Sequence, residues 1–188
     1  MPDWRDPLLW KLAIALGASN QFYFCTNAFL PGYLTGAGRA DLIVPALTAL
    51  NVGQLPASFM LLAMASRWER RAWPFVVAGA IGLAGLLVIV TTASLLTVIA
   101  AGVVGFAIAW TFTLQLALPA LLCAPADVPR VSAGMFTIGY SIAMGVSVLA
   151  GYAWDLTGIP AFAFLPVALA ALPLLVVTPL IDFSRRPN

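Results

Sequence analysis

The chain has 188 residues, of which 62% are hydrophobic and only 9% are charged. Soluble domains carry roughly 25% charged residues, so this composition excludes an ordinary soluble fold and predicts an integral membrane protein. At about 20 residues for each crossing, the length allows six transmembrane helices joined by short loops. The net charge of +2 says little as a total, and its distribution along the chain says more.

Six apolar runs follow one another, and each is long enough to cross a bilayer. Charged residues lie near the ends of these runs or between them, and residues 72–126 carry no charge. The first run is expected to be a retained span, because the residues before it mix both signs of charge and no cleavage site follows it. We therefore expect one all-α domain over residues 1–188, with spans at residues 8–34, 42–66, 73–92, 95–121, 132–153 and 161–181.

Basic residues mark one side of the predicted bundle. With both termini on the same side, that side has eight basic residues and the other has only Arg39. Cytoplasmic loops are enriched in Lys and Arg, so both termini are expected to face the cytoplasm, across a bacterial inner membrane. Most tryptophans lie near span ends, as in an aromatic belt, and Trp110 is the exception. The eight basic residues are Arg5, Lys11, Arg67, Arg70, Arg71, Arg130, Arg185 and Arg186.

The first span is unusually polar. Its residues 17–34 include two asparagines and a glutamine, and amides in hydrocarbon cost free energy unless they face a partner helix or a water-filled cavity. Asn20, Tyr23 and Asn27 are spaced at i, i+3 and i+7, which places them on one side of a helix. We expect this side to line a solute path, with the other spans closing the membrane around it.

The later spans continue a pattern of polar, polar, apolar. The third span has only Thr91 and Thr92 at its end, and the sixth has only Thr178. This order predicts a 3+3 repeat in which the third and sixth spans face lipid. The polar residues of the second, fourth and fifth spans are Thr48, Asn51, Gln54 and Ser58; then Trp110, Thr111, Thr113 and Gln115; then Ser132, Thr137, Tyr140, Ser141 and Ser147.

Small residues and prolines indicate how the spans approach one another. Two rows of small residues at four-residue spacing predict close helix contacts in lipid. Pro31, Pro56 and Pro119 predict kinks in the first, second and fourth spans. The rows are Ala101, Gly105 and Ala109 on the fourth span, and Ala133, Thr137, Ser141 and Gly145 on the fifth.

Three stretches carry a family resemblance. They are residues 4–10 leading into residues 20–31; the basic loop at residues 66–71 (Ser-Arg-Trp-Glu-Arg-Arg); and residues 151–158, a G-x-x-x-D-x-x-G pattern. In this order they resemble the carboxy-terminal half of a major facilitator superfamily transporter, most of all its cyanate/nitroimidazole permease branch. The basic loop lacks the glycines and the aspartate usual in that family. The resemblance implies half of an alternating-access carrier, with the first, second, fourth and fifth spans lining a central cavity.

Enzymatic chemistry has no support in the residues present. The chain has no histidine, which excludes a Ser–His protease and a histidine-rich metal site. Its carboxylates lie at span ends, so an intramembrane aspartyl protease lacks its pair, and no phosphate-binding glycine loop or nucleic-acid-binding basic patch appears. Cys25 and Cys123 are expected to be small core residues. We expect no enzyme, no cofactor and no metal.

The candidate solute-binding residues are amides, hydroxyls and one indole. Because no charged residue lies at mid-membrane, an ion-coupling group would have to lie in another half, or transport is facilitated diffusion. The donors present suit a small organic or inorganic anion or a polar neutral solute. For the amides at 51 and 115 the alternative is helix-packing glue, and for the indole it is packing. The residues are Asn20, Tyr23, Asn27, Asn51, Gln54, Trp110, Gln115 and Tyr140.

A lone six-helix half would expose its cavity-lining face, so the chain is expected to need a mate. The mate is a second copy, a separate amino-terminal half, or the rest of a longer chain; membrane lipid and the solute are the other partners, and nucleic acid is not. The main alternative to a carrier is a non-transporting membrane scaffold or regulatory subunit, against which the clustered amides count. A channel is a further alternative, but no ring of charged residues marks a selectivity filter.

Overall fold

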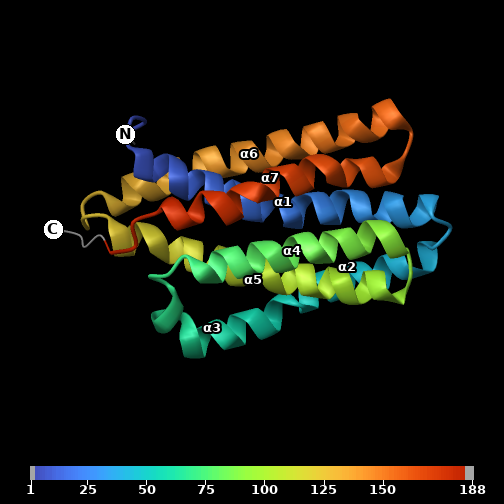
Figure 1. Ribbon diagram of the computed structural model, residues 1–188, viewed down its shortest axis with the longest axis horizontal. Helices are drawn as coiled ribbons and strands as arrows, with labels where there is room; N and C mark the ends of the chain where they lie inside the picture. Colours follow the sequence, from blue (N-terminus) through green and yellow to red (C-terminus); the bar gives the residue numbers. More distant parts are fainter. Residues whose placement is uncertain (1–2, 185–188) are drawn as a thin grey trace.

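The computed structural model describes residues 3–184, and this part of the chain is helical with no strand (Figure 1). Short 3₁₀ helices at Ala40–Leu42, Pro160–Ala163 and Thr178–Leu180 flank the second and the last of the long segments. The α-helices are α1 (Pro7–Gly36), α2 (Ile43–Val52), α3 (Gln54–Trp68), α4 (Trp73–Thr92), α5 (Leu95–Leu122), α6 (Val128–Thr157) and α7 (Phe164–Val176).

Five helical segments are long and apolar enough to cross a membrane, which makes the chain an all-helical integral membrane protein. They are Ala40–Trp68, Trp73–Thr92, Leu95–Leu122, Val128–Thr157 and Pro160–Leu180. The first helix, α1, has 30 residues but is not among the five. Polar residues lower its hydropathy, so its crossing, and with it the sixth span, stays a prediction.

The helices form two layers. One layer consists of α6, α1, α5 and the α2–α3 segment, in that spatial order, and α4 and α7 cover one face of it (Figure 1). Helix α1 packs against α5, α6 and α7, whereas α5 packs against α1, α2, α3 and α4. These two helices are therefore central. The opposite face of the four-helix layer is not covered by any described helix, and we call it the open face.

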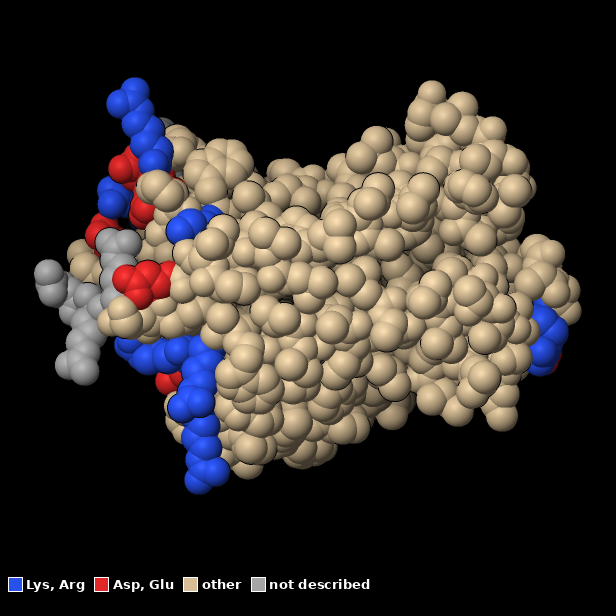
Figure 2. Space-filling model, in the orientation of Figure 1, with Lys and Arg blue, Asp and Glu red and all other residues tan. Residues whose placement is uncertain are grey.

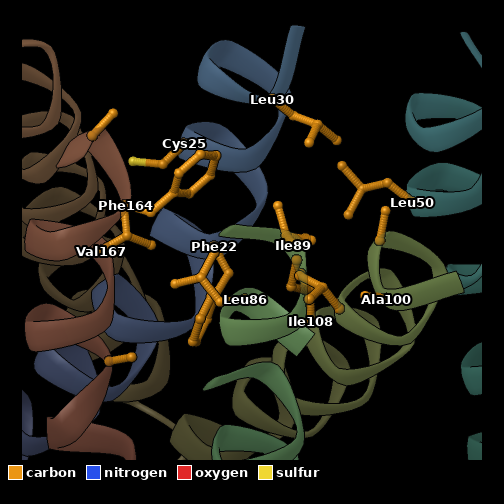
Figure 3. Packing of buried hydrophobic residues seen from close by; sticks show 14 of the residues in the cluster. Phe22, Cys25, Leu30, Leu50, Leu86, Ile89, Ala100, Ile108, Phe164 and Val167 are labelled. Atoms are coloured by element: carbon orange, nitrogen blue, oxygen red, sulfur yellow. The ribbon is translucent and has the colours of Figure 1, made fainter. Parts of the chain in front are cut away.

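The hydrophobic core lies between the two layers. Figure 3 shows Phe22 of α1 beside Leu86 of α4, with Ile89 and Ile108 close by. Phe22 is 3% exposed, and its ring packs on Gly82 of α4, where a Cβ atom would lie 3.3 Å from the ring. Burying a side chain of this size contributes about 1.5–3 kcal/mol. Phe22 thus points from α1 toward α4, and the opposite side of α1 is turned toward the open face.

Local sequence signals set the helix ends. Pro7 is the first residue of α1, and the Asp6 carboxylate accepts a hydrogen bond from the Leu8 N–H (2.9 Å). At the start of α5, the Ser94 hydroxyl and the Thr97 side chain form a capping box. Helix α6 ends at Gly158, which has a φ of +67°. That residue is the last glycine of the G-x-x-x-D-x-x-G pattern, so this part of the pattern specifies a helix stop.

The second span is broken between α2 and α3, where the sequence predicts a kink. Pro56 has no N–H to donate to the Val52 carbonyl, so the helix cannot run through this turn without losing a hydrogen bond. Pro31 and Pro119 lie inside α1 and α5, which continue past them. The break therefore belongs to Pro56 alone among the three prolines.

Helix α5 crosses the second span at close range. A Cβ atom on Gly105 would overlap the Leu50 carbonyl oxygen of α2, and one on Gly53 would overlap the Gly102 carbonyl oxygen of α5. Backbone atoms rather than flexible side chains occupy these positions, so the crossing requires glycine. The prediction of a close contact through Gly105 is confirmed.

The second predicted row of small residues does not pack. Ala133, Thr137, Ser141 and Gly145 are exposed, and no atom of another residue would lie within 4 Å of a Cβ atom on Gly145. Helix α6 meets α1 instead through Gly139, whose carbonyl oxygen would lie 2.9 Å from a Cβ atom on Gly17. Four-residue spacing identifies a helix face but not the neighbour that the face meets, so a close contact through this row stays a prediction.

Charged side chains gather at the two ends of the bundle (Figure 2). Nearly all basic residues lie at the end that carries both termini; Arg185 and Arg186 are outside the described residues. At the other end, Arg39 pairs with Asp41 (3.0 Å) and donates to the Ala93 carbonyl (3.2 Å), which ties the turn after α1 to the turn after α4. The hydrogen bond to Asp41 raises the pKa of Arg39. Which side of the membrane each end faces stays a prediction.

Substituting Gly105→Ala should destabilise the protein, because the new methyl group meets a backbone oxygen that cannot move cheaply. Overpacking of this kind costs about 1–3 kcal/mol, and thermal unfolding in detergent followed by circular dichroism would measure it. Gly145→Ala is the matched control, because its methyl group enters open space. Equal melting temperatures for the two variants would contradict the crossing described here.

Candidate functional site

Polar and aromatic side chains form a continuous band across the open face, from α2 through α1 to α6. The Tyr23 hydroxyl of α1 donates to the Asn51 Oδ1 atom of α2 (3.2 Å). Next to it, the Phe24 ring contacts the Tyr140 ring of α6, with 6.0 Å between centroids. Tyr140 stacks in turn on Phe136 (5.9 Å). Three helices that are far apart in the sequence therefore contribute to one surface, and we call it the polar band.

The two amides of the polar band keep unused hydrogen-bonding capacity. Asn27 donates from Nδ2 to the Tyr23 carbonyl one turn earlier (2.8 Å), and Asn51 does the same to the Leu47 carbonyl (2.8 Å). An asparagine side chain offers two N–H donors and an oxygen with two lone pairs. After these bonds each amide retains a second N–H, so both can hold a solute without giving up a bond to the backbone.

Asn20 lies one turn before Tyr23 on the same side of α1 and is the most enclosed member of the set. Its side chain is 5% exposed, and its Nδ2 atom has no hydrogen-bond partner among the described residues. A buried donor left without an acceptor costs about 1–3 kcal/mol. Such groups are rare in native proteins and call for an explanation, which a bound solute or a partner surface would provide.

Among the described residues, three other buried side chains also have an atom without a hydrogen-bond partner, but they lie in the core. Gln21 lacks a partner at Oε1, but its Nε2 donates to the Val167 carbonyl of α7 (2.9 Å) and so anchors that helix. Thr26 and Trp110 also have one unpartnered atom each, and both are buried. The side of α1 that carries Gln21 and Phe22 faces α7 and α4, so these atoms are part of the core. Asn20 differs because its side of the helix is the open one.

Gln115 belongs to a helix contact and not to the open face. It is 1% exposed; its Oε1 accepts from the Ser19 hydroxyl (2.7 Å) and its Nε2 donates to the Ala15 carbonyl (2.9 Å). Both ends of the amide are therefore used to join α5 to α1. This is the helix-packing role that the sequence left open for this residue.

Trp110 is likewise placed in a packing cluster. Its ring lies 5.3 Å from that of Trp68, 6.2 Å from Trp73 and 5.8 Å from Phe106, and the residue is 7% exposed. The cluster joins α5 to the end of α3 and the start of α4. Gln54 is half-buried at the first position of α3, next to the break and close in sequence to Asn51.

The structure thus brings together five of the eight candidate residues, Asn20, Tyr23, Asn27, Asn51 and Tyr140, and places Gln115 and Trp110 elsewhere. Sequence reasoning missed Phe24, which is 41% exposed and joins the α1 and α6 parts of the polar band. The sequence signal for it was its place as an aromatic residue between Tyr23 and Asn27. The hydrogen bond from Ser19 to Gln115 across the helices was also not predicted.

Comparison of the chain with protein-family models, with curated proteins and with solved structures finds no match. The geometry described above is therefore the basis for assigning a function.

The contact between Ser19 and Gln115 should couple energetically. In a double-mutant cycle with Ser19→Ala and Gln115→Leu, we expect a coupling free energy of about 0.6 kcal/mol, with about 1.7 kcal/mol as the upper end for such pairs. Unfolding in mixed micelles of each variant would measure it. Thr113→Val, exposed on the same helix, is the control and should change stability by less than about 0.5 kcal/mol. Strictly additive effects would contradict the hydrogen bond.

Proposed function

We propose that this chain is one half of an alternating-access carrier for a small polar solute, with the open face lining the solute path. The observation that carries the proposal is the polar band together with the enclosed, unpartnered amide of Asn20 behind it. Lipid offers no hydrogen-bonding partner to such groups, whereas a wet cavity between two halves does. The resemblance of the chain to major facilitator transporters agrees with this proposal, and we propose membership of that family as well.

The contrast between the two faces of the bundle supports the proposal. The exposed large side chains of α4 and α7 are hydrocarbon, among them Val77, Leu87, Leu165, Leu169 and Leu172. These are the side chains that a lipid-facing helix presents. On the open face, by contrast, amides, hydroxyls and aromatic rings of three helices are in contact, beside exposed apolar side chains of α6 such as Met144 and Val148. One face therefore suits acyl chains, and the other suits water, solute and protein.

The packing order supports a 3+3 arrangement. Helix α1 packs against α6 and α7, the second and third members of the later triplet, and α5 packs against the α2–α3 segment and α4, the second and third members of the earlier one. Each triplet's first helix thus contacts the same two positions of the other triplet. An exchange of this kind is what a two-fold axis relating two triplets produces.

The chemistry of the polar band suits a small anion or a polar neutral molecule. The band consists of amides, phenols and phenyl rings, and no residue in it carries a charge. Amide and hydroxyl donors can bind an anion or a carbonyl or nitro group, but they do not titrate near neutral pH. A proton-coupling group would thus be supplied by the mate, or transport is facilitated diffusion.

The open face also supports the proposed requirement for a mate. In the α2–α3 segment, which borders this face, only 17% of the most apolar stretch is buried, against 56% in the central helix α5. On the other border, the exposed small residues of α6 leave room for the close approach of another helix. A second six-helix half, from a second copy, a separate chain or the rest of a longer chain, would cover both borders.

Uptake measurements on the band would test the carrier. Radiolabelled cyanate and a neutral nitroimidazole are the probes, assayed in cells with the membrane abundance of each variant matched. Asn20→Ala, Tyr23→Phe and Asn27→Ala should each lower uptake of the transported probe by about tenfold, because each removes a hydrogen bond worth about 1–1.5 kcal/mol. Thr91→Val, exposed on α4, should leave uptake unchanged. Full uptake in all three of these variants would instead favour a scaffold or regulatory subunit.

Photocrosslinking in membranes would test the mate. Ser141→Cys, on the exposed row of α6, labelled with a benzophenone maleimide whose excited ketone inserts into a C–H bond of any close neighbour, should form an adduct on illumination, and its mass would identify the mate as a second copy or another chain. Leu172→Cys, on the exposed side of α7, is the matched control and should crosslink much less. The native thiols at 25 and 123 are buried and should contribute little background. An adduct with the control alone would refute the open face as the mating surface.

A further inference from the structure

We propose that the junction between α3 and α4 binds the headgroup of an anionic phospholipid. A surface hollow of about 590 Å³ lies at this junction, lined by Met64, Ser66, Arg67, Trp68, Arg70, Arg71 and Trp73. Three arginines, Arg67, Arg70 and Arg71, line it. This site is separate from the polar band, and the proposal does not depend on the carrier function.

Two arginines at the hollow, Arg67 and Arg71, differ from Arg39 and Arg130 in having no ion pair in the described part of the chain. Arg39 pairs with Asp41 at 3.0 Å, and Arg130 pairs with Asp127 at 2.7 Å. Arg67 and Arg71 are exposed and form no ion pair within residues 3–184, and the one acidic residue of the loop is Glu69. Arg67 and Arg71 thus carry positive charges for which no described residue supplies an ion-pair partner.

The backbone and aromatic contacts hold the hollow in shape. Arg70 donates from Nη2 to the Leu121 carbonyl near the end of α5 (3.0 Å), which fixes the loop against that helix. Trp68 and Trp73 pack edge to face with centroids 5.5 Å apart, and both line the hollow. Because Trp68 also packs on Trp110, the loop is anchored to the core of the bundle. A preformed hollow loses less conformational freedom on binding.

The position of the hollow selects a lipid over a soluble anion. Helix α3 ends at Trp68 and α4 begins at Trp73, so the hollow lies where two apolar spans leave the membrane. Tryptophan rings prefer this headgroup level, and basic pockets beside transmembrane helices bind acidic headgroups. The guanidinium groups would contact the phosphate oxygens, and the indole rings with Met64 would contact the glycerol and upper acyl chains.

Native mass spectrometry of the full chain in detergent would test the site, with phosphatidylglycerol and phosphatidylcholine as probes. We expect phosphatidylglycerol to bind at least about tenfold more tightly. Replacing two arginines, R67Q with R71Q, should weaken phosphatidylglycerol binding about 25-fold, at about fivefold for each basic residue, and should leave phosphatidylcholine binding unchanged. The control R5Q with R130Q removes the same charge from the same end of the bundle and should weaken binding less than twofold.

Three results would overturn the proposal. They are an equal loss in the control pair, no preference for phosphatidylglycerol over phosphatidylcholine, and complete displacement of the lipid by millimolar inorganic phosphate. A salt series on the unaltered chain provides a test that needs no variant to fold. The preference for phosphatidylglycerol should fall as salt rises from 0.1 M to 1 M, because the Debye length shrinks from about 10 Å to about 3 Å. A preference that is constant across this series would also contradict an arginine–phosphate contact.

Discussion

A polar side chain within a bilayer must find a hydrogen-bonding partner, and the arrangement of this protein follows from how that requirement is met. Ser19 and Gln115 meet it by bonding across α1 and α5, and Gln21 meets it at α7. These bonds hold the central helices together where hydrophobic attraction between helices is absent, since lipid is as apolar as leucine. Helix α1 can be the most polar of the long helices because its neighbours surround it on three sides.

The need for hydrogen-bonding partners also accounts for the difference between the two faces of the bundle. The second layer, α4 and α7, shields the back of α1 and α5 and presents hydrocarbon outward. The front of the four-helix layer has no such cover, and there amides, phenols and phenyl rings lie beside exposed apolar side chains of α6 such as Met144 and Val148. The close α2–α5 crossing at Gly105 brings α2 near the centre of the layer, and Asn51 of α2 bonds to Tyr23 of α1.

Hydropathy and helix signals in the sequence were sufficient to predict the long helices, whose bounds agree with the structure to within a few residues in most cases, and the crossing of α1 stays a prediction. The largest differences are α6, which begins at Val128 and not at 132, and the break at Gly53, where Pro56 removes a backbone donor. Spacing also predicted that Tyr23 and Asn27 share a side of α1. Periodicity identifies the face of a helix on which a residue lies, and the shared faces could therefore be predicted.

Periodicity does not report what a face meets. For Gln115 and Trp110 the sequence left a choice between solute binding and helix packing, and the structure gives both residues packing contacts, Gln115 with α1 and Trp110 with Trp68. The row at Thr137 and Ser141 was expected to pack and is exposed. Each of these points concerns the rotation of a helix relative to its neighbours, which depends on side-chain fit across the whole bundle. The contact between Phe24 and Tyr140 could not be predicted from the sequence for the same reason.

The most direct test of the central claim is the water accessibility of the open face in intact membranes. Single cysteines at Asn51 and Tyr140 would be compared with cysteines at Leu87 and Leu169, using a membrane-impermeant maleimide, which reacts with the thiolate that forms only in water. The account predicts at least tenfold faster labelling at the first pair. Equal labelling at both pairs, or none at Asn51 and Tyr140, would show that the open face contacts lipid and would contradict it.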